Sequence, residues 1–193
     1  MLIPATTPSF VGWRASQGRR SVRKPADGAR IRRLAAELAR RAPAETRIYL
    51  TGGATAVLEG WRPTTIDVDI RLEPESDELL RAISELKDKL DINIELASPA
   101  DFLPELPGWR ERSRFRFDEA GLSVYDYDLY SQALSKIERG FDLDLEDVDS
   151  MLASGLVDRD RLRELFAQIE DELHRFPAVD PDGLRAKLER ALA

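Results

Sequence analysis

Hydrophobic residues recur along the chain with two different periods. A spacing of three to four residues, which is typical of amphipathic helices, predicts helices over residues 28–41, 77–89, 128–139, 144–153 and 159–175, and a last one from residue 181. Short apolar runs predict strands over residues 48–50, 66–70 and 92–96 and a β-hairpin over residues 112–125. We therefore expect an α/β fold, with a small mixed β-sheet flanked by helices and an α-helical C-terminal subdomain.

Charge is unevenly distributed along the chain. Residues 1–41 hold ten Arg or Lys residues against two acidic ones, whereas the whole chain has a net charge of −7. Pro and Gly interrupt residues 1–26, which we predict to be a basic, flexible arm that either binds RNA phosphates or serves as a solubilising tail. The sheet-containing core would then span residues 27–128, and the helical subdomain residues 129–193.

The stretch from Ile48 to Ile70 contains the residues with the most evident chemistry. Its first apolar strand ends at Gly52 and Gly53, a short helix-compatible segment follows, and the next strand carries Asp67 and Asp69. Residues two apart on a strand point to the same side. We therefore expect both carboxylates on one face of the sheet.

Two carboxylates on one strand face repel each other unless a cation lies between them. Mg²⁺ takes oxygen ligands, commonly one or two carboxylates together with substrate phosphates, and two such ions about 3.5–4 Å apart suit phosphoryl-type transfer. Gly52 and Gly53 allow the backbone to approach a phosphate closely, and their N–H groups at a helix start would donate to it. The pattern predicts a Mg²⁺ site for a phosphate compound, with Mn²⁺ as the alternative metal.

These motifs resemble the signature of the DNA polymerase β-like nucleotidyltransferase superfamily, in which Gly-Gly or Gly-Ser precedes Asp-x-Asp. More narrowly, residues 46–150 are similar to the AbiEii and MenT branch of toxin nucleotidyltransferases and its uncharacterised bacterial relatives. That branch has Gly-Gly-x-Ala and then an Arg-x-Ser/Thr-x-Asp-hydrophobic-Asp run. The matching residues here are Gly52, Gly53, Thr55 or Ala56, Arg62, Thr65, Asp67 and Asp69, with Pro63 inside the run.

The resemblance implies a transfer of NMP from an NTP to an acceptor hydroxyl. A third carboxylate would come from the following strand, where Glu95 is the first candidate and Asp91 its competitor. The branch also has a Lys-x-x-Arg helix before an Asp-x-x-Asp helix start. Those places are taken here by Lys136, Arg139, Asp144 and Asp147.

By the same resemblance, each group has an expected role. Asp67, Asp69 and Glu95 would hold Mg²⁺ and, with Lys136, form the catalytic set. The acids of the second motif would orient its cations. The nucleotide itself would be bound by Gly52, Gly53, Arg62, Thr65, Lys136 and Arg139.

The acceptor implied by this resemblance is tRNA or another RNA. The protein would then be the toxin of a toxin–antitoxin or phage-defence system, restrained by a cognate antitoxin. Two alternatives remain open: nucleotidylation of a protein or small molecule, and a catalytically silent module of the same fold that binds a partner. Asp67 and Asp69 would in that last case be solvated carboxylates at the end of a strand.

Other chain features restrict the chemistry or add candidates. The chain has no cysteine and a single histidine, His174, which we expect on the surface, so cysteine nucleophiles and histidine metal clusters are excluded. No apolar run has membrane-spanning length and no signal peptide is recognisable, which predicts a cytoplasmic protein. Three further arginines share one predicted face of the hairpin, as candidate phosphate ligands or as an ordinary charged face: Arg112, Arg114 and Arg116.

Overall fold

The computed structural model describes residues 23–193, so most of the predicted basic arm lies outside the described residues. One five-stranded sheet has the order β3-β2-β1-β5-β4. Its strands are β1 (Arg47–Thr51), β2 (Asp67–Glu73), β3 (Asn93–Leu96), β4 (Arg114–Glu119) and β5 (Leu122–Asp126). β1 runs antiparallel to β2 and parallel to β5, and β2 runs parallel to β3. The sheet is therefore mixed, and the predicted fold class is confirmed.

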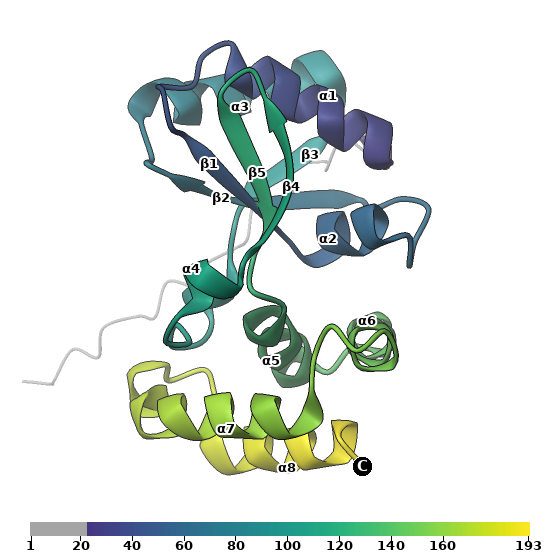
Figure 1. Cartoon of the computed structure of the whole chain (residues 1–193), viewed down its shortest axis with the longest axis vertical. Helices are drawn as coiled ribbons and strands as arrows, with labels where there is room; N and C mark the ends of the chain where they lie inside the picture. The colour runs from purple at the N-terminus through teal and green to yellow at the C-terminus, as the bar shows by residue number, and fades with distance from the viewer. Residues whose placement is uncertain (1–22) are drawn as a thin grey trace, which may run out of the picture.

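Helices are arranged on both sides of this sheet (Figure 1). The α-helices are α1 (Gly28–Ala39), α2 (Gly52–Glu59), α3 (Asp77–Leu90), α4 (Trp109–Arg112), α5 (Leu129–Arg139), α6 (Asp142–Ala153), α7 (Arg159–Ile169) and α8 (Pro181–Ala191). Two 3₁₀ helices complete the described elements, η1 (Pro99–Asp101) and η2 (Glu170–Arg175). The side chains of Asp27, Ser76 and Asp158 accept hydrogen bonds from the first turns of α1, α3 and α7, as their capping patterns predict.

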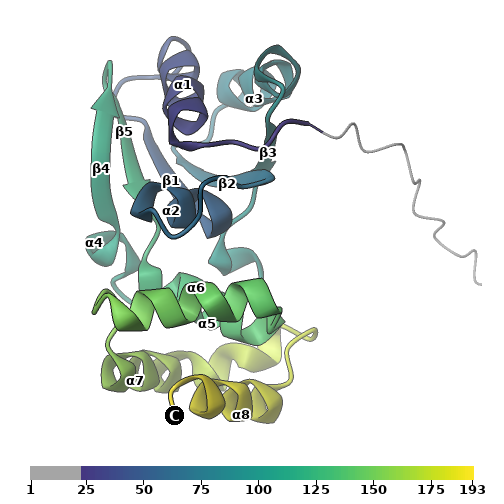
Figure 2. The same cartoon turned by 90° about the vertical axis from the view of Figure 1, so that its right-hand side faces the viewer.

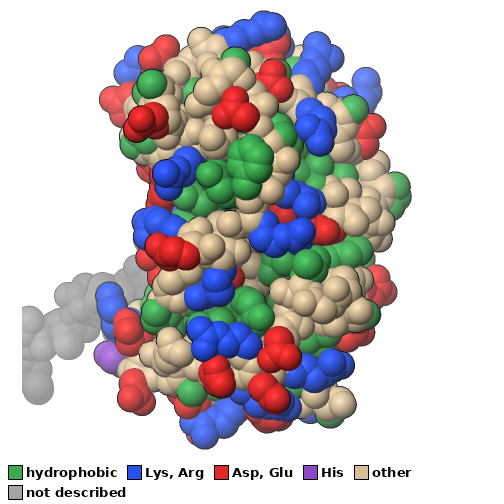
Figure 3. Space-filling view, in the orientation of Figure 1, with side chains coloured by type: hydrophobic (Ala, Val, Ile, Leu, Met, Phe, Trp, Pro, Cys, Tyr) green, Lys and Arg blue, Asp and Glu red, His purple; other side chains and the backbone are tan. Residues whose placement is uncertain are grey.

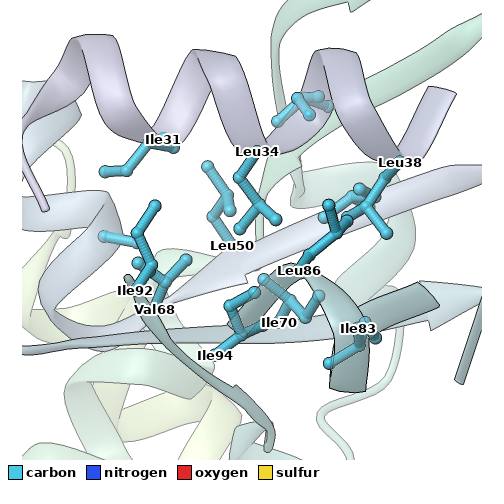
Figure 4. Close-up of a cluster of buried hydrophobic side chains, with 14 of the residues drawn as sticks. Ile31, Leu34, Leu38, Leu50, Val68, Ile70, Ile83, Leu86, Ile92 and Ile94 are labelled. Atoms are coloured by element: carbon cyan, nitrogen blue, oxygen red, sulfur yellow. The ribbon is translucent and has the colours of Figure 1, made fainter. Parts of the chain in front are cut away.

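The first hydrophobic cluster lies between one face of the sheet and helices α1 and α3. Alternate residues of β2 point into it, because Val68, Ile70 and Leu72 are buried while the residues between them are not. Figure 4 shows how side chains from two helices and three strands meet there: Ile31, Leu34, Leu38, Leu50, Val68, Ile70, Ile83, Leu86, Ile92 and Ile94. This packing leaves the other face of β2 to its polar residues.

A second hydrophobic cluster joins α5, α6, α7 and α8, which lie beyond the opposite face of the sheet (Figures 1 and 2). Helix α5 is the element of this group nearest the sheet. Its Gln132 side chain accepts a hydrogen bond from the Gly52 N–H at 2.9 Å and donates to the Tyr127 carbonyl at 2.8 Å. The polar face of β2 is therefore placed opposite α5.

The hairpin differs from its predicted alternation. Arg112 belongs to α4, and the strand starts only at Arg114. A β-bulge between Phe115 and Phe117 shifts the register, so Phe117 packs against the first cluster whereas Phe115 is 58% exposed. A bulge inserts one residue into a strand and reverses the faces beyond it, which is why Phe115 and Phe117 do not share a face although they are two residues apart.

Leu103, in the loop before α4, and Trp109, the first residue of α4, are buried, whereas Phe102 is 50% exposed. His174 is exposed, which confirms its predicted surface position. Within residues 23–193, none of the helices is both long and apolar enough to span a membrane. Side chains of both charges are interspersed over the face in Figure 3, with hydrophobic side chains exposed between them.

Candidate functional site

Asp67 and Asp69 leave the same face of β2, on the side away from the first hydrophobic cluster. They alternate with Ile66, which is exposed, and with Val68 and Ile70, which are buried. Both carboxylates lie at the start of β2, next to the last residue of β1, because Thr51 is paired with Asp69 in these antiparallel strands. The predicted shared face is therefore present.

Glu95 comes to the same face through the parallel pairing of β3 with β2. In the register of these strands Asp69 lies beside Glu95, and Asp67 lies beside Asn93. The Asn93 side-chain amide donates to Asp67 and, at 3.1 Å, to Glu95. Asp91 instead caps the C-terminus of α3 in the left-handed conformation, and its carboxylate lies 3.8 Å from the Lys24 ammonium. Of the two candidate third carboxylates, only Glu95 joins the pair.

Burial and repulsion act together on Asp69. Burial is the larger cause, and the charges of Glu95 and Asp67 add to it, so that the pKa of Asp69 rises to about 6 from its usual 3.8. The positive charges of Arg139 and Lys136 act in the opposite direction. No Lys or Arg among residues 23–193 forms an ion pair with any of these three carboxylates. The negative charge of the group is therefore not neutralised by any ion pair within residues 23–193.

Gly52 allows the start of α2 to lie directly against Asp69. Its φ of +59° is in the left-handed region, and a Cβ there would stand 2.9 Å from the Asp69 carboxylate oxygen. Both properties favour glycine. The N-terminus of α2 has no side-chain cap, and its first N–H, that of Gly52, donates to Gln132.

Gly53 is required for a different contact. A Cβ on Gly53 would lie 2.0 Å from the Thr65 hydroxyl oxygen, which donates to the Asp67 carbonyl at 2.9 Å. The Thr65 backbone also pairs with Ala26 in both directions. These hydrogen bonds of Thr65 therefore fix the backbone at the start of β2, next to Asp67.

Helices α5 and α6 supply a second charged group. The Lys136 ammonium contacts Asp147 at 2.6 Å and Asp144 at 3.2 Å, and Arg139 contacts Asp144 at 2.6 Å. Arg62, from the loop after α2, donates from Nε to Asp147 at 3.0 Å, and its Nη2 also contacts that carboxylate. Lys136, Asp144 and Asp147 are buried. The expected pairing of these acids with Lys136 and Arg139 is present.

The two groups face each other across a cavity of about 110 Å³. Four charged side chains line it: Asp69, Glu95, Lys136 and Arg139. The remaining lining residues are Thr51, Gly52, Ala97, Ser98, Pro99, Phe102, Gln132 and Ser135. The structure thus brings together residues 52, 69, 95, 136 and 139 of the predicted site. Asp67 lies beside the cavity, whereas Gly53, Arg62 and Thr65 support it from outside its lining.

The donor set suits a hard divalent cation, although the carboxylates stand apart. In the part of the chain that the structure describes, no three Asp, Glu or His side chains converge closely enough to enclose a metal ion. Asp67 is turned toward the Asn93 amide instead. The residues nevertheless fit Mg²⁺ chemically, because carboxylate oxygens are its preferred ligands and because a cation would relieve the repulsion that raises the pKa of Asp69.

Seven of the lining residues were missed as candidates for the site, among them Gln132, Ser135 and Phe102. Gln132 precedes Lys136 by four residues, so the helical period places both on one face of α5. That spacing was available as a signal. Hydrophobicity alone would place Phe102 in the core, and no local pattern distinguishes an exposed phenylalanine from a buried one.

The arginines of the hairpin region are engaged elsewhere. Arg112 pairs with Asp128, while Arg114 and Arg116 both contact Glu59. Arg116 also lies 3.0 Å from the buried Asp126 carboxylate. Burial raises the pKa of Asp126 to about 7. This cluster is absent from the lining of the cavity, so its acids and arginines stabilise the sheet edge rather than the site.

A larger cavity of about 470 Å³ lies among α5, α6 and α8 and also reaches Arg139. Asp149 is its single carboxylate, beside Lys187 and Arg190. It therefore lacks the paired carboxylates that metal-assisted transfer requires.

A mixed sheet that carries paired carboxylates beside a Gly-Gly helix start is the arrangement that the resemblance to nucleotidyltransferases implied. The chain belongs to the family described as nucleotidyltransferase of unknown function (DUF6036), whose model matches residues 29–178. This match supports membership of the nucleotidyltransferase superfamily. It does not assign the chain to the AbiEii and MenT branch. No curated protein and no solved structure matches the chain.

Proposed function

We propose that the protein is a Mg²⁺-dependent nucleotidyltransferase that transfers NMP from an NTP to an acceptor hydroxyl of RNA. The observation that carries the proposal is the cavity between β2–β3 and α5. One wall carries carboxylates that have no ion-pair partner in residues 23–193, and the other carries the cations Lys136 and Arg139, which already pair with Asp144 and Asp147. A nucleoside triphosphate with bound Mg²⁺ would bring a cation to the first wall, and its phosphates would contact the cations of the second.

The carboxylates would hold the metal. Asp69 and Glu95 line the cavity, and Asp67 would join them by leaving its contact with Asn93. When bound, Mg²⁺ lowers the pKa of the acceptor hydroxyl and neutralises the charge that develops on the α-phosphate and pyrophosphate.

The triphosphate would be positioned by the start of α2 and by α5. Because the Gly52 N–H already donates to Gln132, the N–H of Gly53 is the next one that the helix start offers to a phosphate. Lys136 and Arg139 would add positive charge, which stabilises the transferring group most strongly when it is held in advance. Arg62 acts through Asp147, and Thr65 through the backbone of Asp67, as positioning residues.

RNA as the acceptor rests on the resemblance to toxin nucleotidyltransferases, of which tRNA is the implied substrate. The basic composition of residues 1–41 is consistent with binding a polyanion. A role as a toxin restrained by a cognate antitoxin belongs to the same proposal.

The test is to incubate the purified protein with Mg²⁺, each α-³²P-labelled NTP and total bacterial RNA, with Asp67→Ala in parallel. We expect label in RNA that the variant does not produce, and the labelled species identifies the nucleotide. Label on protein instead of RNA would indicate that the acceptor is a protein. No label in RNA, protein or small molecules would contradict nucleotidyl transfer.

A second candidate is a catalytically silent module of the same fold. It is favoured by one observation, that the three carboxylates do not converge in the described residues. This module would bind no Mg²⁺ at Asp69, so an Mg²⁺ titration that leaves the pKa of Asp69 near 6 would favour it.

A further inference from the structure

Phe102 is an aromatic residue that the packing of the protein does not explain. Its side chain is 50% exposed, although it lies between Leu103, which is buried, and the buried part of η1. Among the large hydrophobic side chains that are exposed in residues 23–193, Phe102 is the one that lines the cavity with Asp69 and Lys136. An exposed aromatic ring beside a charged cavity is a surface for a ligand that is itself partly apolar.

The backbone around Phe102 is held by several contacts. Ser98 and Asp101 form a reciprocal capping box around η1, with the Ser98 N–H donating to Asp101 at 2.7 Å. The N–H groups of Phe102 and Leu103 both donate to the Pro99 carbonyl, at 3.1 and 3.0 Å. Leu103 anchors the turn in the second hydrophobic cluster. The position of the Phe102 backbone is therefore set before any ligand binds.

The size of the cavity leaves part of a nucleotide outside it. Its volume of about 110 Å³ is well below the roughly 300–1,000 Å³ of sites that enclose a whole ligand. Its charged walls suit the phosphates and their metal. The nucleoside must then lie at the rim, where Phe102 offers an apolar surface.

We propose that Phe102 is the stacking platform for the base of the bound nucleotide, whose triphosphate enters the cavity between Asp69 and Lys136. This inference rests on the proposed function and adds to it the recognition of the nucleoside. Each base has an apolar π-face, so a phenyl ring binds it without selecting its hydrogen-bonding edge. The platform therefore favours nucleotides as a class, and purines over pyrimidines because of their larger faces.

The experiment compares four NTPs, which share the triphosphate and differ in the base, with inorganic tripolyphosphate, which has no nucleoside. Dissociation constants of ATP, GTP, CTP, UTP and inorganic tripolyphosphate are measured by calorimetry with Mg²⁺ and without acceptor. The proteins are the full chain and its variants Phe102→Ala, Phe102→Trp and Phe115→Ala. Phe115 is the matched control, since it is 58% exposed and lies on β4, at the opposite edge of the sheet from β3.

We expect Phe102→Ala to weaken NTP binding about 5- to 150-fold, the range for loss of one base–aromatic stack. Tripolyphosphate binding should stay unchanged, Phe102→Trp should bind NTPs at least as tightly as the wild type, and Phe115→Ala should bind like the wild type.

Three outcomes would overturn the proposal, and they separate it from the proposed function. If Phe102→Ala binds NTPs like the wild type, the base does not stack there, although nucleotide binding stands. If the variant loses NTP and tripolyphosphate equally, Phe102 supports the turn rather than the base. If the wild-type protein binds neither ligand, the proposed function fails together with the inference.

Discussion

Two groups of acidic residues differ in how they are paired: one lines the cavity, and the other contacts the cations that line it. Asp144 and Asp147 on α6 are buried and are paired with three cations, Arg62, Lys136 and Arg139. Asp69 and Glu95 on the sheet lie beside each other without an ion-pair partner in residues 23–193, and burial, together with the charges of Glu95 and Asp67, raises the pKa of Asp69. The acids of α6 are therefore neutralised by neighbouring side chains, whereas those of the sheet have no ion-pair partner among the described residues.

Pairing distinguishes the two groups of carboxylates better than a shifted pKa does. Asp126 also has a raised pKa, of about 7, but its buried carboxylate contacts Arg116 and does not line the cavity that holds Asp69. Buried ion pairs cost desolvation and are strongly destabilising only when one partner is lost. The two groups should therefore respond to substitution in different ways.

The largest effect is expected for Asp69→Asn, which keeps the shape of the side chain and removes its charge. Nucleotidyl transfer should fall at least about 100-fold, because metal stabilisation of the transition state amounts to several kcal/mol. The melting temperature at pH 7 should stay the same or rise. Asp126→Asn is the control, a buried carboxylate outside the cavity that should retain transfer. Retention of activity by Asp69→Asn would refute the metal mechanism.

Asp147→Ala should give the largest loss of stability. It leaves Lys136 and Arg62 without a shared buried partner, and removal of one member of a buried pair costs about 3–5 kcal/mol. Urea unfolding measures this loss, with Asp69→Asn as the comparison that should lose nothing. An equal loss in both variants would show that the two acidic groups are not treated differently.

Glu95→Gln and Asp91→Asn test which acid completes the sheet group. We expect at least about a 10- to 100-fold loss of transfer for Glu95→Gln, the range found when even the partners that orient metal ligands are removed. Asp91→Asn should keep wild-type activity because its side chain lies at the end of α3, near Lys24. The measurement is the steady-state rate of transfer by each variant at saturating Mg²⁺. A larger loss for Asp91→Asn than for Glu95→Gln would reassign the third ligand to Asp91.

The smallest effect concerns pH. Asp69 keeps its proton to about pH 6 in the folded protein and loses it near pH 3.8 when unfolded, so the folded state binds more protons between these values. Its contribution to stability is therefore lost as the pH rises through this window. Relative to Asp69→Asn, the unfolding free energy of the wild type should fall by about 1 kcal/mol between pH 5 and 7. Saturating Mg²⁺ should remove this fall, and a fall that persists would argue against a metal at Asp69.

Much of the fold followed from local patterns in the sequence. The period of two in β2 predicted that Asp67 and Asp69 share a face, and the caps at Asp27, Ser76 and Asp158 predicted helix starts. These features depend on residues close in the sequence, whose sterics and hydrogen bonds are the same in most folds. The bulge in β4 escaped prediction because the identity of Arg116 does not mark it as an inserted residue.

By itself, the sequence determined the chemical types present: paired carboxylates, a Gly-Gly turn and a Lys-x-x-Arg helix. The tertiary structure alone decided which of them meet. Glu95 reaches Asp69 only through the parallel pairing of β2 and β3, and Gln132 reaches Gly52 across 80 residues of chain. Such contacts arise from the packing of whole elements around the two hydrophobic clusters, a property of the entire chain that no local pattern records.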